Sequence, residues 1–347
     1  MDLVSVVVVN FNGRQRLPAC LESLRRQTYP SVEVIVVDNA STDGSIALVH
    51  DAFPDVHVVG LRRNVGFATG CNAGIATARG NFIATLNNDA RAEPTWIEEL
   101  VRAAEHRPDV GMVAAKMLFA DAPSTINSTG ICIDRTAISW DRDGGKQDHE
   151  VPSASEVFGP SAGAALYRRQ LFDDVGGFDD DFFLYLEDVD LAWRARLAGW
   201  RCIFAPGARV LHDHSATAND SSPFKRYHLG RNKVWLVAKN YPMPYLLLYL
   251  PVILLFDLAA VALVTLGPES ASFPLASRAA RVVGRIVGTL TLGRALAKRG
   301  SVQRRRRVPR WRVLAEMAGI SGPRVLFRRH AHLFERAKHR IANLTTA

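Results

Sequence analysis

Runs of β-branched and other apolar residues alternate with segments of helical apolar spacing over the first 115 residues. Five runs predict strands, at 4–9, 32–37, 56–61, 82–86 and 110–115. Between them, apolar positions that recur every three or four residues predict helices, at 14–27, 41–49, 68–78 and 94–101. This alternation with short connections is typical of an α/β fold, so we expect a mostly parallel sheet flanked by helices on both faces.

The pattern weakens between residues 118 and 155, where Gly, Ser, Asp and Pro predict an irregular excursion. Order returns at 158–167. A further helix is predicted at 189–198, where Gly199 ends it.

The composition changes abruptly after Pro244. Residues 245–266 are apolar except for Asp257. We therefore expect two domains: a catalytic α/β domain over 1–242, and a membrane-associating region over 243–347 that consists of the apolar segment and basic amphipathic helices.

The formal net charge of +9 conceals an uneven distribution. Up to Gly267 the chain has 25 basic and 31 acidic residues, whereas from Pro268 onward it has 18 basic and 3 acidic residues, a net charge of +15. This division excludes a uniformly basic protein that coats nucleic acid. The tail has no basic motif with interleaved aromatic residues, so we expect no nucleic-acid partner and favour an anionic membrane surface instead.

The cysteines are few and far apart in the chain, at Cys20, Cys71, Cys132 and Cys202. This spacing disfavours a zinc knuckle or a disulfide framework and fits a reducing compartment. The chain enters its first strand directly after Met-Asp, so we expect no secretory signal. We predict that the catalytic part works in the cytosol, at the cytoplasmic face of the cell membrane.

Polar residues close three of the predicted strands. They are Asn10 and Asn12 after the first, Asp38 and Asn39 after the second, and Asn87, Asn88 and Asp89 after the fourth. In an open α/β sheet, ligands bind where the carboxyl ends of the strands gather. Each group alone would fit a turn or a helix cap, but three groups at one edge favour a binding site.

The two common phosphate-binding loops are absent. The first strand leads into NFNGRQRL, which has one glycine instead of the pattern G-x-G-x-x-G, and G-x-x-x-x-G-K-[ST] does not occur. A diphosphate would therefore need a metal ion or basic side chains.

One carboxylate and two histidines could hold such a metal. Asp89 can give one oxygen to Mg²⁺ or Mn²⁺, and Mg²⁺ typically takes one or two protein carboxylates and fills its other positions with phosphate and water. His212 and His214 follow a short apolar run and could add a ligand, although a lone histidine is more often structural.

A second acidic cluster opens the helix predicted around 189–198. Glu187 and Asp188 lie there, and a carboxylate at this place could act as a general base. The alternative is an acid that complements the helix dipole, and for Asp190 this alternative is the preferred interpretation.

Taken together, these motifs resemble the family 2 inverting glycosyltransferases. The resemblance rests on VSVVVVNFNGRQRLPACLESLRRQTYP, VVDNASTDGS, RNVGFATGCNAGI, LNNDAR, GGFDDDFFLYLEDVDLAWRARLAGW and VLHDHSAT, and it covers residues 3–242. It is strongest for the rhamnosyltransferase-like branch, which assembles bacterial cell-surface glycans. It implies the GT-A fold, a nucleotide-diphosphate sugar donor and a divalent metal, Mg²⁺ or Mn²⁺.

The resemblance also implies roles for single residues. Nucleotide-sugar binding falls to Asn10, Asn12, Asp38, Asn39, Arg63, Asn64, Gly66, Asn72, Asn87 and Asn88, with Asp38 reading the donor base. Metal binding falls to Asp89 and His212, and Asn87 stands where the family's D-x-D motif has its first carboxylate. The catalytic base would be Asp188 with support from Glu187, and the diphosphate would face Arg231 and Asn232.

The implied reaction moves a sugar, with rhamnose favoured, to a hydroxyl of a lipid-linked or cell-surface glycan acceptor. Asp188 would take the proton of that hydroxyl, and the metal would stabilise the leaving nucleoside diphosphate. Galactofuranosyl, glucosyl or N-acetylhexosaminyl transfer is an alternative, and so is a catalytically silent membrane scaffold. The joint presence of Asp38, Asp89, Asp188 and His212 argues against the scaffold.

Residues 245–266 are long enough to cross a bilayer, for which about 20 apolar residues suffice. A single crossing would put the +15 tail opposite the catalytic domain, against the tendency of Lys and Arg to stay cytoplasmic. Pro251 and Asp257 interrupt the segment, and the next candidate, 282–297, contains two arginines.

We therefore expect a re-entrant or interfacial segment, followed by basic amphipathic helices on the cytoplasmic leaflet. Helical spacing supports such helices at Leu314, Met317 and Ala318, and again at Leu326, Phe327, Leu333 and Phe334. The alternatives are a buried core helix and an arginine-rich solvated face.

Overall fold

The computed structural model describes residues 1–105, 107–151, 153–213, 222–266 and 275–320, with the backbone alone for 260, 261 and 263–266. The chain forms two compact units. The first comprises 1–131 and 141–214, and the second comprises 132–140 and 215–347. The division falls at residue 214, inside the region that the sequence assigns to the catalytic domain.

The first unit alternates strands and helices along most of its length. Its strands are β1 (Val4–Asn10), β2 (Val32–Asp38), β3 (His57–Gly60), β4 (Phe82–Leu86), β5 (Ala90–Ala92), β6 (Val110–Phe119), β7 (Ala122–Ser128), β10 (Ser155–Val157), β11 (Ala164–Arg168) and β12 (Arg201–His212). Its helices are α1 (Leu17–Arg25), α2 (Ser45–Ala52), α3 (Gly66–Thr77), α4 (Trp96–Glu105), η1 (Asp148–Glu150), α5 (Arg169–Val175), η2 (Asp180–Phe182) and α6 (Glu187–Leu197). Two further strands, β8 (Ile131–Ile133) and β9 (Ser139–Asp141), pair in a small separate sheet.

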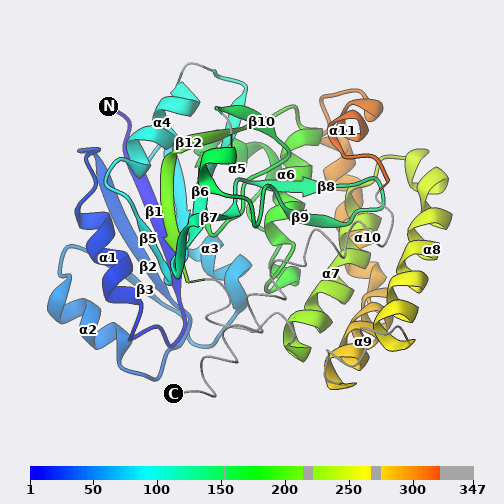
Figure 1. Ribbon diagram of the computed structural model, residues 1–347, viewed down its shortest axis with the longest axis horizontal. Helices are drawn as coiled ribbons and strands as arrows, with labels where there is room; N and C mark the ends of the chain where they lie inside the picture. The colour runs from blue at the N-terminus through cyan, green and yellow to red at the C-terminus, as the bar shows by residue number, and fades with distance from the viewer. Residues whose placement is uncertain (106, 152, 214–221, 267–274, 321–347) are drawn as a thin grey trace. The chain divides into compact units, whose positions relative to one another are not determined.

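The main sheet has ten strands and is mixed (Figure 1). Its order is β10-β12-β6-β11-β4-β1-β2-β3, with β5 paired to β12 and β7 paired to β6. Strands β3, β2, β1 and β4 run parallel as predicted, but β11 lies antiparallel between β4 and β6. The expectation of a mostly parallel sheet is corrected here, because the chain enters β11 from the carboxyl edge, where Ala164 pairs with Leu86, instead of after a crossover helix.

Helices cover both faces of the parallel part, as the sequence predicted. On one face, alternate β1 residues such as Val6 and Val8 join a core with α1, α2 and α4. On the other face α3 lies against the sheet, and a Cβ added to its Gly74 would come within 2.5 Å of the Val7 side chain. The two faces of one apolar strand are thus both buried, which explains why its sequence does not alternate.

Two predicted segments differ from the observed ones. The helix expected from residue 41 begins at Ser45, because Gly44 adopts φ 75° and the three residues before it form the β2–α2 loop. The excursion at 118–155 is not irregular but contains the end of β6, then β7 to β9 and η1. Polar edge strands such as β7 carry no apolar period, so periodicity does not predict them.

The second unit is helical except for residues 132–140, which hold most of β8 and β9. Its helices are α7 (Pro223–Asn240), α8 (Tyr245–Leu266), α9 (Leu275–Leu290), α10 (Leu292–Arg304) and α11 (Arg310–Glu316). The close packing of α7 with α9 and α10 groups α7 with the C-terminal helices instead of with the sheet. Leu314 and Met317 are buried, and the pattern predicted at 326–334 lies outside the described residues. As far as the description of the chain extends, no helix is long and apolar enough to cross a membrane.

Candidate active site at the carboxyl edge of the sheet

Asn10, at the end of β1, joins the ends of three strands. Its side chain is fully buried, and its Nδ2 donates to Ser41 Oγ at 3.1 Å and to Ser45 Oγ at 3.0 Å. The same nitrogen lies 3.4 Å from Asp38 Oδ1, at the end of β2. Asn10 Oδ1 accepts from Asn88 Nδ2 at 2.9 Å, so the polar ends of β1, β2 and β4 form one hydrogen-bonded group at the edge where the sequence predicted that they gather.

The end of β2 also fixes the start of α3. Both carboxylate oxygens of Asp38 lie within 3.3 Å of the backbone nitrogen of Ser41, which closes a tight turn. The amide of Asn39 donates to Gly66 O at 3.0 Å and accepts from Val65 N at 2.9 Å. Asn39 therefore holds the segment predicted to line the nucleotide against the carboxyl edge.

Within that segment, Gly66 is required by its surroundings. Its φ is +84°, and an added Cβ would lie 2.3 Å from the backbone oxygen of Phe183. Asn64 Oδ1 accepts from Gly66 N at 2.9 Å, and Phe67 N donates to Phe183 O at 2.7 Å. Arg63 is exposed beside this turn. The start of α3 thus abuts the loop that precedes α6.

Asn72 holds the same loop from further along α3. Its Nδ2 donates to Phe178 O at 2.8 Å and to Asp180 Oδ1 at 2.7 Å, and its Oδ1 accepts from Phe178 N at 2.8 Å. Both ends of the amide are used in positioning the 178–180 turn. Its predicted contact with the nucleotide stays a prediction.

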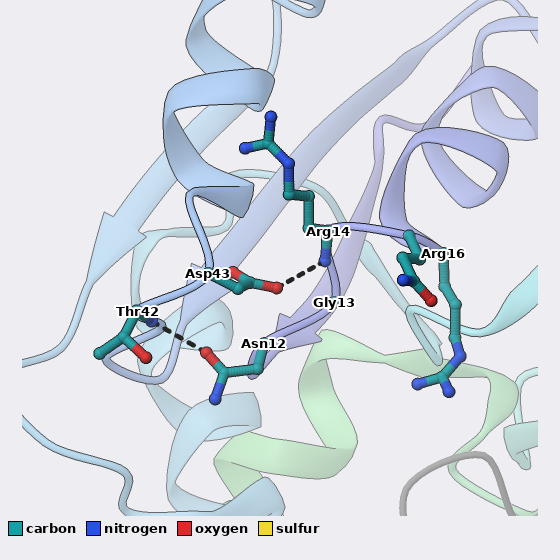
Figure 2. Close-up of a pocket in the computed structure, with 7 residues that line it drawn as sticks. Asn12, Gly13, Arg14, Arg16, Thr42 and Asp43 are labelled. Carbon is teal, nitrogen blue, oxygen red and sulfur yellow. Dashed lines mark hydrogen bonds between the residues drawn. The ribbon is translucent and has the colours of Figure 1, made fainter.

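A cavity of about 450 Å³ opens beside Asn12, between the loops that follow β1 and β2 (Figure 2). It is lined by Asn12, Gly13, Arg14, Gln15, Arg16, Thr42 and Asp43. Asn12 Oδ1 accepts from Thr42 N at 2.9 Å, and Arg14 N donates to Asp43 Oδ2 at 2.8 Å, so the two loops are bound to each other. Burial raises the pKa of Asp43, but hydrogen bonds from Ser45 and from Arg14 N outweigh it and hold that pKa below its usual value.

The two arginines of this cavity were not among the predicted site residues. Figure 2 shows their side chains pointing in opposite directions from the β1–α1 loop, and Arg14 Nη1 donates to Gly44 O at 2.9 Å. The signal was present in the sequence, because a loop without the glycine patterns was expected to need basic side chains for a diphosphate, and Arg14 and Arg16 lie in that loop.

The side chains of His212 and Asp89 face each other, with a ring nitrogen opposite a carboxylate oxygen. His212 Nε2 is 3.3 Å from Asp89 Oδ1, and His212 Nδ1 is 2.8 Å from Asn127 Oδ1. An amide oxygen only accepts, so a neutral ring that donates from Nδ1 to Asn127 presents the lone pair of Nε2. Asn87 Nδ2 is also 3.3 Å from Nε2. Asn127, on β7, was missed by the sequence analysis because it lies in the excursion without periodicity.

This donor set fits a divalent cation. Asp89 Oδ1 is buried and receives no hydrogen bond, which leaves a buried acceptor unsatisfied. A cation beside this oxygen would satisfy it and would take His212 Nε2, 3.3 Å away, as a second ligand in place of the contact with Asn87 Nδ2, and Asn127 would orient the ring as partners of metal-ligating histidines do. No group of three or more His, Cys, Asp or Glu suited to a metal occurs among the described residues, and His214 lies outside them.

Asp188 is the second residue of α6, which follows a loop with an unusual backbone. Phe183, Tyr185 and Leu186 have φ of 64°, 70° and 66°, a region in which non-glycine residues are strained. Asp188 Oδ1 accepts from Val189 N at 2.8 Å. Such strain is often found at functional sites, where the surrounding structure holds it in place.

The acidic pair at this helix start has raised pKa values. Burial raises the pKa of Asp188 to about 6, opposed by backbone hydrogen bonds and assisted by the charge of Asp141. Glu187 is buried, its Oε2 receives no hydrogen bond, and burial together with the charge of Asp188 raises its pKa well above the usual value. Asp190 differs, because it is fully buried and pairs with Arg194 at 2.8 Å, which gives it a structural role.

A short turn connects Asp188 to the strand end that carries the candidate metal ligands. Ala162 N donates to Asp188 Oδ2 at 3.3 Å, and the next residue, Gly163, accepts through its oxygen from Asn87 N at 2.9 Å. The Asp188 carboxylate is therefore connected to the Asn87–Asp89 strand end through two backbone residues, Ala162 and Gly163.

Arg231 and Asn232 lie on α7 in the second unit. The Arg231 guanidinium is 4.5 Å from the ring centroid of Trp235 and 5.6 Å from that of Tyr227, and its Nε donates to Asn232 Oδ1 at 2.9 Å. Asn232 is fully buried. Their predicted role at the diphosphate stays a prediction.

Known proteins are similar to this chain in both sequence and fold. The family model described as Glycosyl transferase family 2 matches residues 5–176. An N-acetylglucosaminyl-diphospho-decaprenol L-rhamnosyltransferase of Mycobacterium tuberculosis is 29% identical over 253 residues, which cover 65% of this chain and 82% of the relative. A pre-mycofactocin glycosyltransferase of the same organism is 31% identical over 237 residues, which cover 66% of this chain but 46% of the relative.

Among solved structures, GalNAc-T7 with UDP, GalNAc and Mn²⁺ matches with a TM-score of 0.59 at 15% identity, covering 86% of this chain and 57% of that chain. This likeness shows a GT-A-like fold. The family match spans β1 to α5, and the strand ends in this range carry the candidate site. The relatives are named as glycosyltransferases, which argues against a catalytically silent scaffold. The chain belongs to glycosyl transferase family 2 and is a glycosyltransferase.

Proposed function

We propose that this glycosyltransferase inverts the anomeric centre of a nucleotide-diphosphate sugar, with Asp188 as the catalytic base. The observation that carries the proposal is the position of a carboxylate with a pKa of about 6, joined through Ala162 and Gly163 to the strand end of Asn87 and Asp89. A base with this pKa is largely ionised at neutral pH and still accepts a proton readily.

In the proposed reaction, Asp188 accepts the proton of the acceptor hydroxyl as that oxygen attacks the anomeric carbon. The bond from this carbon to the diphosphate oxygen breaks as the new glycosidic bond forms. The nucleoside diphosphate leaves with the electron pair, and attack from the opposite side inverts the configuration. Burial and the charge of Asp188 raise the pKa of the neighbouring Glu187 well above its usual value, so Glu187 would stand beside the base as a neutral carboxylic acid.

Asp89 and His212 would hold Mg²⁺ or Mn²⁺. When bound, the ion neutralises the charge that develops on the leaving diphosphate. Asn10, Asp38 and Asn88 position the strand ends, and the exposed Asn12 and the arginines of the adjacent cavity supply polar and basic groups on the same edge.

Rhamnose is the favoured sugar, and a lipid-linked glycan is the favoured acceptor. Both are supported by the relative whose name gives an L-rhamnosyl transfer to N-acetylglucosaminyl-diphospho-decaprenol, which is similar to this chain over 65% of its length. Galactofuranosyl, glucosyl or N-acetylhexosaminyl transfer stays the alternative, because donor selectivity depends on the shape of the pocket, which similarity at this level does not fix.

The test is a donor panel of dTDP-, UDP- and GDP-sugars with Mn²⁺ or Mg²⁺, followed by thermal shift and by product formation on a polyprenyl-diphosphate-linked acceptor. We expect stabilisation by dTDP-rhamnose and transfer with inversion. Asp188→Asn should abolish transfer and keep donor binding, whereas Asp51→Asn, at an exposed position on α2, should change neither. Near-wild-type turnover of Asp188→Asn would show that another group is the base.

A further inference from the structure

The second unit exposes more large apolar side chains than the first. In the described part of the chain, every large apolar side chain that is exposed lies in the second unit, except Met1 and Phe11. Six are on α8: Leu247, Leu248, Leu250, Leu254, Leu255 and Leu258. Four are on α9: Leu275, Val283, Ile286 and Leu290. We call these ten residues the apolar face. A soluble surface rarely exposes so many such residues without a partner.

The opposite side of α8 is already occupied within the unit. Asp257, the one charged residue of the helix, accepts from Lys233 Nζ at 2.6 Å and from Arg285 Nη2 at 2.8 Å, which ties α8 to α7 and α9. One turn earlier, Ile253 is only 3% exposed, whereas Leu255 is 64% exposed. The leucines are therefore the outer side of a helix whose inner side is closed.

The inner side of α9 is closed as well. A Cβ added to Gly284 would lie 2.1 Å from Tyr227 O, so the backbones of α7 and α9 are in direct contact there. Val283, Ile286 and Leu290 recur at helical spacing on a different side of α9 from this contact and are 47%, 53% and 79% exposed. Neither helix uses the apolar face in the packing of the described unit.

The charge of the helices that follow α8 indicates what covers this face. Between residues 275 and 320 there are twelve Lys and Arg residues and one acid, Glu316. A second copy of this chain would bring the same positive charge to the contact and be repelled. An anionic lipid surface offers both hydrocarbon for the leucines and headgroup charge for the arginines.

We propose that α8 and α9 lie along an anionic phospholipid bilayer, with the apolar face in the acyl boundary and exposed arginines of the following helices, such as Arg304 and Arg310, at the headgroups. Since α7 and α9 close one side of α8, only its other side faces lipid, as in helices that lie in the plane of the interface. The cytoplasmic leaflet carries anionic lipid, which agrees with the location expected from the sequence. This proposal concerns where the enzyme sits and does not depend on which sugar it transfers.

The experiment is sedimentation of the full chain with vesicles of phosphatidylcholine alone or mixed with phosphatidylglycerol, at low and high salt. The test variant is Leu248→Gln/Leu255→Gln/Leu258→Gln. The matched control replaces the same three leucines with Met, which keeps the apolar character. We expect the wild type to bind the phosphatidylglycerol vesicles, the Gln variant to bind at least about tenfold more weakly, and the Met variant to bind like wild type. High salt should weaken binding of all three.

Circular dichroism and thermal stabilisation by donor establish that both variants are folded. The proposal is overturned if the wild type does not sediment with anionic vesicles, or if the Gln and Met variants bind equally well. It is also overturned if size-exclusion chromatography without lipid shows a dimer that the Gln variant loses, because a second copy would then cover the face. A failure of sugar transfer would leave the vesicle result unaffected, so the two proposals fail separately.

Discussion

The rate of sugar transfer should fall steeply below pH 6, because burial and the charge of Asp141 raise the pKa of Asp188 from 3.8 to about 6. The ionised carboxylate is the active form of a base, so activity is lost as the pH falls through the raised pKa. With this pKa, roughly half of the carboxylate is ionised at pH 6 and about one-tenth at pH 5. At its ordinary pKa, more than about nine-tenths would stay ionised at pH 5.

The substitution Asp141→Asn tests one cause of the shift. The negative charge of Asp141 raises the pKa of Asp188, so its removal should move the acidic limb of the rate profile to lower pH. The rate at pH 8 should stay close to that of the wild type, because Asp188 is fully ionised there in both proteins. Asp51→Asn is the matched control, since Asp51 is exposed on α2 and should leave the limb in place.

The assay is kcat between about pH 5 and 8 at saturating donor, acceptor and Mn²⁺. Thermal shift with donor at each pH separates loss of binding from loss of the base. A kcat that stays level down to pH 5 would refute the reasoning, and so would an acidic limb that Asp141→Asn moves to higher pH.

Three further predictions follow from the site. Asn127→Leu removes the oxygen that orients His212, so the affinity for Mn²⁺, measured by titration calorimetry without donor, should fall about 10–100-fold. The control Asn127→Asp keeps an acceptor and should bind Mn²⁺ within a few-fold of wild type. Unchanged affinity in the Leu variant would contradict the assignment. Gly66→Ala places a Cβ 2.3 Å from Phe183 O at a φ of +84° and should cost about 1–3 kcal/mol in urea unfolding, whereas Gly60→Ala, with no atom within 4 Å, should not show this clash. Asp188→Asn should raise Tm at pH 8, because an ionised acid whose pKa is raised in the folded state lowers the free energy of unfolding, here by on the order of 2 kcal/mol. The gain should shrink near pH 4, where the wild-type carboxyl group is protonated in the folded protein. A lower Tm of the variant at pH 8 would argue against the pKa shift.

Part of the candidate site could be predicted, because some of its residues end strands that the apolar pattern of the sequence locates well. The observed β1, β2 and β4 agree with the predicted runs to within one residue at each end. A strand buried on both faces must be apolar along its whole length, and this requirement is local. Asn10, Asp38 and Asp89 therefore stood out as polar breaks at one edge of a sheet, and the structure brings the first two into one hydrogen-bonded group.

Other site residues had no such local signal. Asn72 resembles a nucleotide-lining residue in sequence, but its amide is fully engaged with the 178–180 turn. Arg14 and Arg16 lie in a loop that was expected to need basic side chains for a diphosphate, but only the cavity beside them singles out these two residues. In each case the use of a side chain depends on which distant segment it meets.

The sequence by itself determined the α/β core, its strand ends and the membership of the chain in its family, because these follow from local apolar patterns and from motifs. Only the tertiary structure decided that β11 runs antiparallel between β4 and β6, that Asn127 orients His212, and that the Ala162–Gly163 turn connects Asp188 to the strand end of Asn87. Asn127 comes from the region between 118 and 155, where the sequence has no clear period, and the turn lies in the ordered segment predicted at 158–167. Strand pairing and hydrogen bonds between residues 26 to 85 positions apart are set by how the whole chain packs, and no local pattern specifies them.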